Sequence, residues 1–322
     1  MRQRSTGSEW WRVILDYLGL ASVVVLLVAG FSLTAENFFS LQTFRPIANQ
    51  IPVLIIASAG MTFVLIVRGI DLSVGSVLAL SSAVLGVCLV RLGWPLPVAL
   101  AACLATGAAC GAVNGLVTVT WRLPPFIVTL GMLEAARGGA YLVTGSRTIY
   151  VGSQIEVIHE TSLLGLSLPF LLAIAVVVAG QLVLWWTPFG RHMVAVGGNE
   201  EAARLSGLRP GLVRLAVFTL CGLLVALAAV VHTSRLASSN PNAGVGFELE
   251  AIAAVVIGGT SLMGGRGSVV RSFFGVLIIA LLGSGLNHLG AQEPTKRLIT
   301  GCVIVAAAVV DYYRRKVGRR AR

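Results

Sequence analysis

Hydrophobic residues gather along the chain in runs long enough to cross a bilayer, and short polar stretches separate them. A transmembrane helix needs about 20 predominantly apolar residues, and windows of that length predict ten spans. They cover residues 18–35, 50–67, 74–90, 95–120, 125–143, 165–186, 212–234, 247–263, 272–289 and 297–312. Glycine and polar residues interrupt the ends of the third and eighth windows. The pattern predicts an all-α integral membrane protein with about ten transmembrane helices.

Composition agrees with this fold class. Of the 322 residues, 56% are hydrophobic and only 11% are charged, and the mean hydropathy is +0.89. Soluble domains carry about 25% charged residues, so this chain has too few to cover a water-facing surface. The first apolar run is too long for a signal-peptide core, so we expect it to be retained as a span.

The net charge of +11 would suit a nucleic-acid partner, but its distribution favours another explanation. With the amino terminus in the cytoplasm, most of the 24 basic residues fall on the cytoplasmic side of the ten spans. This is the positive-inside bias of a multi-pass protein. We therefore expect no nucleic acid and both termini inside. The predicted parts are a cytoplasmic segment (1–17), a transmembrane domain (18–312) and a basic cytoplasmic tail (313–322).

The sequence contains no recognisable catalytic or metal-binding motif. There is no Gly-Lys dipeptide, so the chain cannot contain the phosphate-binding loop G-x-x-x-x-G-K-[ST]. The five cysteines lie in apolar stretches without a C-x-x-C pair, and the four histidines form no H-E-x-x-H. A membrane-bound enzyme is one alternative, but it lacks a catalytic constellation. We expect a non-catalytic chain without metal or cofactor.

The cytoplasmic loop 187–211 between spans six and seven contains a predicted short helix. Asn199 suits its N-cap, two acidic residues follow at the positive end of the helix dipole, and Gly207 suits its end. A two-turn helix is marginal alone, so it must dock, either as a lid on its own inner face or on a cytoplasmic partner. The segment comprises Asn199, Glu200, Glu201, Ala202, Ala203, Arg204, Leu205, Ser206 and Gly207.

This central loop also divides the spans. After the first span, five spans (two to six) precede the loop and four follow it, and spans two and seven run in opposite directions. An inverted repeat around the loop would have this organisation.

Polar residues inside the spans must face protein or a cavity, because hydrocarbon cannot satisfy them. Glu134 and Arg137 share one face of span five, as a structural ion pair or as part of a solute route. Asp71 could cap the helix that follows it, or act at a gate or a partner contact. Gly107, Gly111 and Gly115 predict close helix packing in span four. The candidates for a solute pathway or gate are Asn49, Thr62, Asp71, Ser73, Asn114, Thr129, Glu134, Arg137 and Asn287.

Four segments in matching order resemble ATP-binding-cassette (ABC) importer permeases of the ribose/xylose/arabinose/galactose type. The loop helix resembles their coupling loop, and Gly-Ile-Asp-Leu-Ser-Val-Gly at 69–75 resembles a family signature. Pro-Phe-Ile-Val-Thr-Leu-Gly at 125–131 and the glycine-rich stretch 248–268 resemble two further segments. Arg68 departs from the pattern, since a glycine often stands there.

The resemblance implies a permease subunit in the bacterial inner membrane that moves a monosaccharide inward. It implies three protein partners: an ATP-binding cassette that docks on the loop, a soluble solute-binding protein and a second permease chain, identical or related. Autoinducer-2, polyols and nucleosides are alternative solutes. An ion-coupled secondary transporter remains an alternative class; it would need an intramembrane carboxylate, for which Glu134 is the candidate.

Overall fold

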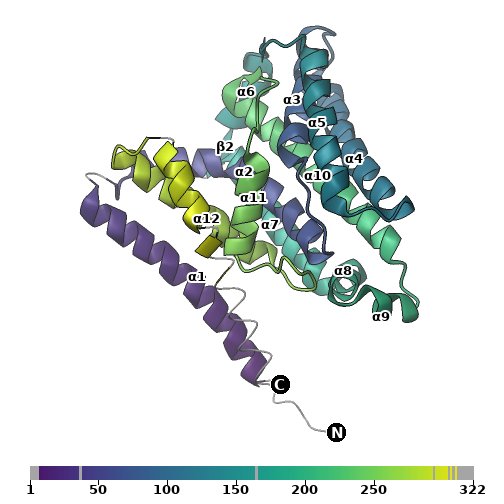
Figure 1. The fold of residues 1–322 in the computed structure, drawn as a ribbon. Coiled ribbons are helices and arrows are strands. Elements are labelled where there is room, and N and C mark those ends of the chain that lie inside the picture. The colour runs from purple at the N-terminus through teal and green to yellow at the C-terminus, as the bar shows by residue number, and fades with distance from the viewer. Residues whose placement is uncertain are drawn as a thin grey trace.

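The computed structural model describes residues 7–35, 38–163, 166–292, 294–303, 305–306 and 309, and most of these are helical (Figure 1). The helices are α1 (Gly7–Thr34), α2 (Leu41–Ile66), α3 (Val74–Val90), α4 (Leu96–Thr120), α5 (Pro125–Thr144), α6 (Ser153–Glu160), α7 (Leu168–Trp186), α8 (Pro188–Gly198), α9 (Glu200–Leu205), α10 (Pro210–Leu236), α11 (Phe247–Ile257) and α12 (Val269–His288). Residues 294–303 are also helical. The strands are β1 (Ile149–Tyr150), β2 (Ser162–Leu163), β3 (Leu166–Ser167) and β4 (Ser238–Ser239).

Helices long and apolar enough to cross a membrane confirm the predicted fold class. Within the described residues seven helices meet that standard, namely α1, α2, α4, α5, α7, α10 and α12, and α3 is a shorter apolar helix. Helix α11 has 11 residues, about 16 Å at 1.5 Å per residue, which is half the hydrocarbon thickness. The predicted eighth span was therefore too long, because the helix stops where glycines begin at Gly258.

The chain ends extend beyond what the structure describes. Helix α1 begins at Gly7, so part of the predicted segment 1–17 is helical. The predicted tail 313–322 and much of the tenth span lie outside the described residues.

Polar caps and prolines set the ends of several helices. Ser40 accepts a hydrogen bond from the Thr43 amide at the start of α2, and Ser268 accepts one from the Arg271 amide at the start of α12. Proline occupies the first turn of α4, α5, α7, α8 and α10, where its missing N–H has no helical partner to lose.

Helices α2 and α10 form the centre of the molecule. Most of α2 is buried, and it packs on α7, α10, α11 and α12, whereas α10 packs on α3 and α4. The two halves of the chain mirror one another in these contacts. In the second half of the chain, α10, α11 and α12 correspond to α2, α3 and α4 of the first half. Helix α2 contacts α11 and α12, which contact each other, and its counterpart α10 contacts α3 and α4, which also contact each other. An inverted repeat requires such a pattern.

The chain between α10 and α11 is irregular and runs back alongside α3. Strand β4 pairs with β1 near α6, where Gly86 of α3 contacts Ser239, and further on Gly75 contacts Gly244. Gly86 and Gly75 are eleven residues apart on one helix, or about 16 Å. The segment 239–246 therefore descends into the layer of helices, and α11 starts there rather than at the surface.

Candidate functional site

Helix α9 occupies the end of the molecule opposite α6, beside α8 (Figure 1). Asn199 caps it, with Oδ1 3.1 Å from the Ala202 amide nitrogen, and Gly207 follows its end with φ +83°. The short capped helix predicted in this loop is confirmed. The preceding helix α8 was not predicted, although Thr187 before Pro188 is a helix-start signal.

Helix α9 is held to the rest of the protein at few points. Ala203 is its one buried residue in the described structure, and it turns that small side chain inward. Glu200 forms a two-point ion pair with Arg214 of α10, with N–O distances of 2.9 and 2.6 Å. These contacts fix the helix at its first turn to the start of α10.

The opposite face of α9 is open to solvent. Glu201 and Arg204 form an exposed ion pair of 2.7 Å, and the hydrogen bond that Arg204 donates to the Glu201 carboxylate raises the pKa of Arg204 above its ordinary value. Leu205 beside them is 79% exposed. A lid folded on its own inner face would bury such a leucine. The charged pair and the leucine form a small surface of the kind that protein partners cover.

A second cluster lies at the break between α2 and α3. Asp71 is buried, and its Oδ1 accepts hydrogen bonds from the Ser73 amide at 2.9 Å and the Ser73 hydroxyl at 2.6 Å. Asn114 of α4 donates to the same hydroxyl at 3.0 Å. Thr129 of α5 donates to the Ile70 carbonyl and accepts from the Leu72 amide.

Asp71 makes an Asx-type turn just before α3, but it does not cap that helix: Ser73 is the N-cap residue, and it has no side-chain cap hydrogen bond. Four predicted pathway residues thus come together in one buried network: Asp71, Ser73, Asn114 and Thr129. The Asn114 Oδ1 atom has no partner among the described residues. The network fastens α4 and α5 to the broken segment between α2 and α3.

Arg137 on α5 does not pair with Glu134. Among the described residues no salt bridge joins the two; instead the Arg137 guanidinium donates to the carbonyls of Pro241 and Ala243 at 2.5 and 2.7 Å. One turn further along α5, Tyr141 donates to Asn242 Oδ1 at 2.5 Å. The predicted ion pair is therefore wrong. The i, i+3 spacing places the two residues on one helix face, but the Arg137 guanidinium instead binds the backbone carbonyls of the irregular segment between α10 and α11.

Glu134 stays exposed near the middle of α5. A carboxylate at that depth cannot face lipid without a cost of about 2.5–3.5 kcal/mol on insertion scales. The irregular backbone of 240–246 is likewise excluded from contact with lipid, because its polar groups would go unsatisfied there. This face of the chain is therefore covered by protein or by water.

The remaining predicted pathway residues lie apart. Thr62 is buried between α2 and α12, 2.7 Å from the Ser272 hydroxyl. Asn287 accepts from Lys296 at 2.6 Å near the end of α12, and Asn49 lies half-buried on α2. The structure does not bring these three to the Asp71 network or to the Arg137 segment.

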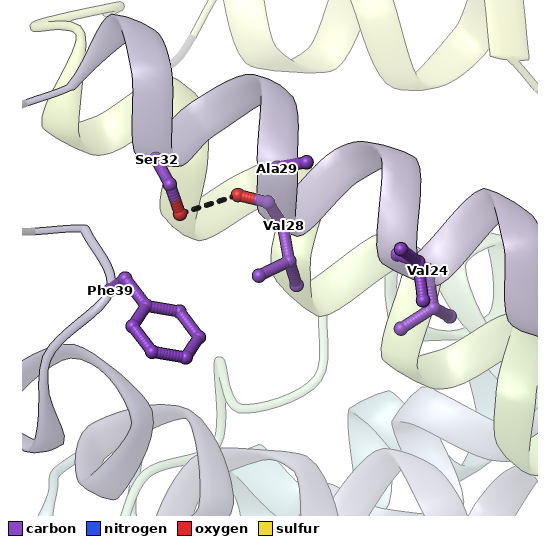
Figure 2. Close-up of a pocket in the computed structure, with 6 residues that line it drawn as sticks. Val24, Val28, Ala29, Ser32 and Phe39 are labelled. Carbon is purple, nitrogen blue, oxygen red and sulfur yellow. Dashed lines mark hydrogen bonds between the residues drawn. The ribbon is translucent and has the colours of Figure 1, made fainter.

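A hollow of about 510 Å³ lies beneath α1. Figure 2 shows Val24 and Val28 on the side of α1 that borders it, with Phe39 beside Val28. Its one hydroxyl, on Ser32, is donated to the Val28 carbonyl of the same helix at 2.6 Å. The hollow offers apolar surface only, which suits hydrocarbon and not a polar solute. Among the described residues, no three or more metal-binding side chains gather anywhere.

The fold and these features define an all-α, multi-pass membrane protein of the transport-permease class. Residues 44–308 match the family described as branched-chain amino acid transport system / permease component, and the chain belongs to that family. It is 40% identical over 293 residues to the ribose import permease protein of Escherichia coli K12, covering 89% of this chain and 91% of the relative.

Two further relatives carry other sugar names. The fructose import permease protein of Rhizobium meliloti is 35% identical over 308 residues, covering 92% of this chain and 85% of the relative. The D-allose transport system permease protein of Escherichia coli K12 is 34% identical over 303 residues, covering 92% and 91%. The resemblance to sugar importer permeases is confirmed. No solved structure gives a significant match.

Proposed function

We propose that this chain is the non-catalytic membrane subunit of an ABC importer that moves a monosaccharide inward. An ATP-binding cassette in a separate chain drives the transport, and a soluble binding protein delivers the sugar from outside. The observation that carries the proposal is α9, a capped helix that is anchored on one side and exposes Glu201, Arg204 and Leu205 on the other. The relatives named for ribose, fructose and allose support the substrate class.

The membrane is the bacterial inner membrane, and α9 lies on its cytoplasmic side. The amino-terminal part of α1 is on the same side: Tyr17 lies 3.3 Å from the Ser268 hydroxyl, next to the loop whose Gly265 amide binds the Ile66 carbonyl. We infer that both termini are cytoplasmic, because the distribution of the basic residues favours that orientation.

The solute passes along the face made by α5 and the segment 240–246. Glu134, Arg137 and Asn242 supply polar groups there, and the irregular backbone needs a watery or proteinaceous neighbour. A second permease chain, identical or related, covers this face and encloses the route. The buried network of Asp71, Ser73, Asn114 and Thr129 holds the neighbouring helices in register and acts as part of the gate, not as a sugar site.

The test is ATP hydrolysis by the co-expressed cassette subunit, with the chain in nanodiscs and with or without loaded binding protein. Glu201→Ala combined with Leu205→Ala is expected to abolish stimulation by the binding protein and to weaken cassette binding. Arg191→Ala is the matched control, because Arg191 is exposed on the adjacent α8. Uptake of labelled ribose, fructose, allose and arabinose into proteoliposomes then identifies the sugar.

The opposite result would be an intact chain that neither binds nor stimulates the cassette, yet moves a sugar along an ion gradient. The chain would then be a secondary transporter, and Glu134 would be the carboxylate to examine.

A further inference from the structure

Arg68 stands immediately after α2 in a left-handed backbone conformation, with φ +63°. Residues other than glycine seldom adopt it, and it costs of the order of a kcal/mol or more. A glycine would remove that cost, and at Arg68 the contacts of the side chain offset it.

The Arg68 guanidinium joins two segments that are distant in the sequence. Its Nη2 donates to the Gly198 carbonyl at 2.7 Å, and its Nε donates to the Met263 carbonyl at 2.9 Å. Gly198 is the last residue of α8, directly before the N-cap of α9. Met263 belongs to the loop 258–268 that separates α11 from α12.

The backbone around Arg68 is packed too closely to accept larger residues. A Cβ on Gly264 would lie 2.3 Å from Arg68 Cγ, and one on Gly197 would lie 1.7 Å from the Ile66 carbonyl oxygen. The Gly265 amide also donates to that oxygen at 2.8 Å. The end of α2, the end of α8 and the loop 258–268 thus form one junction, which we name the Arg68 junction.

The Arg68 junction complements the ion pair between Glu200 and Arg214. The ion pair connects α9 to α10, which packs on α3 and α4. The junction connects Gly198, the residue before the N-cap of α9, to the end of α2, which packs on α11 and α12. Each mirrored group of helices therefore has its own connection to the docking helix α9. Hydrogen bonds from a charged donor are shorter and stronger than those between neutral groups, so both connections are firm.

We propose that Arg68 is the positioning residue that couples displacement of the docking helix to the broken segment between α11 and α12. This rests on the proposed function, since it assumes that a cassette acts on α9. The coupling needs Arg68 and not any cation, because one guanidinium has to bind two carbonyls of different segments at once.

The experiment compares Arg68→Gly, Arg68→Lys and Arg122→Gly in the complete transporter. Arg122 is the matched control: it also has a positive φ, +53°, directly after a helix, and its side chain makes no hydrogen bond within the described residues. Three quantities are measured in nanodiscs and proteoliposomes: cassette binding, the ratio of stimulated to unstimulated ATP hydrolysis, and sugar taken up per ATP hydrolysed.

For Arg68→Gly we expect cassette binding to persist, because Glu201, Arg204 and Leu205 are untouched. The stimulation ratio and the uptake per ATP should both fall about tenfold, the usual size of a coupling between sites. Arg68→Lys should restore only part of either quantity, and Arg122→Gly should behave as the intact chain.

Full stimulation and full uptake per ATP in Arg68→Gly would overturn the inference and leave the proposed function standing. Loss of cassette binding together with a lower unfolding temperature would also overturn it, since Arg68 would then build the inner face and not transmit through it. If Arg68→Gly fails to fold, the test rests on Arg68→Lys. A lysine variant with full stimulation and full uptake per ATP would contradict the inference that one guanidinium must bind both the Gly198 and the Met263 carbonyls. If the intact chain binds no cassette, the proposed function itself has failed.

Discussion

The Glu200 carboxylate and the Arg214 guanidinium meet at two points, with 2.9 and 2.6 Å between nitrogen and oxygen, across fourteen residues of sequence. A two-point pair fixes orientation as well as distance. It sets the direction in which α9 leaves α10, and so it determines where the exposed face of Glu201, Arg204 and Leu205 points.

Arg214→Ala should loosen α9 without unfolding the protein. The pair is partly exposed, so its loss costs at most about 1 kcal/mol, while the six-residue helix depends on its anchors. Hydrogen exchange of the α9 amides should accelerate several-fold, and the unfolding temperature should change little. Arg209→Ala nearby, an exposed residue, serves as control. Unchanged exchange in Arg214→Ala would show that Ala203 alone holds the helix.

Gly111→Val should severely destabilise the chain. A Cβ at Gly111 would lie 2.2 Å from the Phe218 carbonyl oxygen. A Cβ added to Gly107 would likewise lie 2.3 Å from the Gly222 carbonyl oxygen, and one added to Gly222 would lie 2.1 Å from that of Gly107. Backbone atoms cannot move aside cheaply, so we expect a loss of about 3 kcal/mol or more. The amount of folded chain in the membrane and its unfolding temperature in detergent measure this.

Gly131→Ala in α5 is the control, because nothing lies within 4 Å of its added Cβ. It should leave the unfolding temperature unchanged or raise it, since alanine favours a helix. The spacing of Gly107, Gly111 and Gly115 predicts close helix packing in this span, and the structure shows α10 as the partner. Equal behaviour of the two variants would contradict this close crossing of α4 and α10.

Asp71→Asn should be tolerated, whereas Asp71→Ala should not. An asparagine retains the Oδ1 that accepts from the Ser73 amide and hydroxyl, while alanine leaves both donors buried and unpaired. An unpaired buried group costs about 1–3 kcal/mol. Unfolding temperature and sugar uptake are the readouts. An inactive but stably folded Asp71→Asn would show that the charge itself is needed at the gate.

The sequence predicted the features that depend on neighbouring residues. Runs of apolar residues located the spans, and Asn199 and Gly207 located α9 through local capping rules. The end of the eighth span was misjudged because a hydrophobic window averages across the glycines at 258 and 259, which stop α11.

Features that depend on distant contacts could not be read from the sequence. The carbonyls that bind Arg137 are more than a hundred residues away, and a rule about i, i+3 neighbours pointed to Glu134 instead. The Asn-Pro-Asn-Ala-Gly run at 240–244 signals irregular chain, but nothing in it shows that the chain descends beside α3. Arg68 departs from the family pattern in the sequence, but only the fold shows that it donates to the carbonyls of Gly198 and Met263.

Arg137→Met should release the segment 240–246, because methionine retains an unbranched side chain of similar length but has no hydrogen-bond donor. The carbonyls of Pro241 and Ala243 lose their charged donor, so the segment should become mobile and solute uptake should fall by tenfold or more. A cysteine at Val245, which is 68% exposed, reports this through its labelling rate with a membrane-impermeant reagent. Labelling should accelerate in Arg137→Met and should not change in Glu134→Gln.

Glu134→Gln tests whether the polar groups of α5 contact the solute or only hold the segment 240–246. Glu134 is exposed and makes no salt bridge within the described residues, so its amide variant should keep the unfolding temperature. If α5 borders the route, the variant should change the apparent affinity for the sugar by a few-fold without altering Val245 labelling. A Glu134→Gln chain that transports and labels like the intact protein would remove Glu134 from the route and leave Arg137 as a purely structural contact.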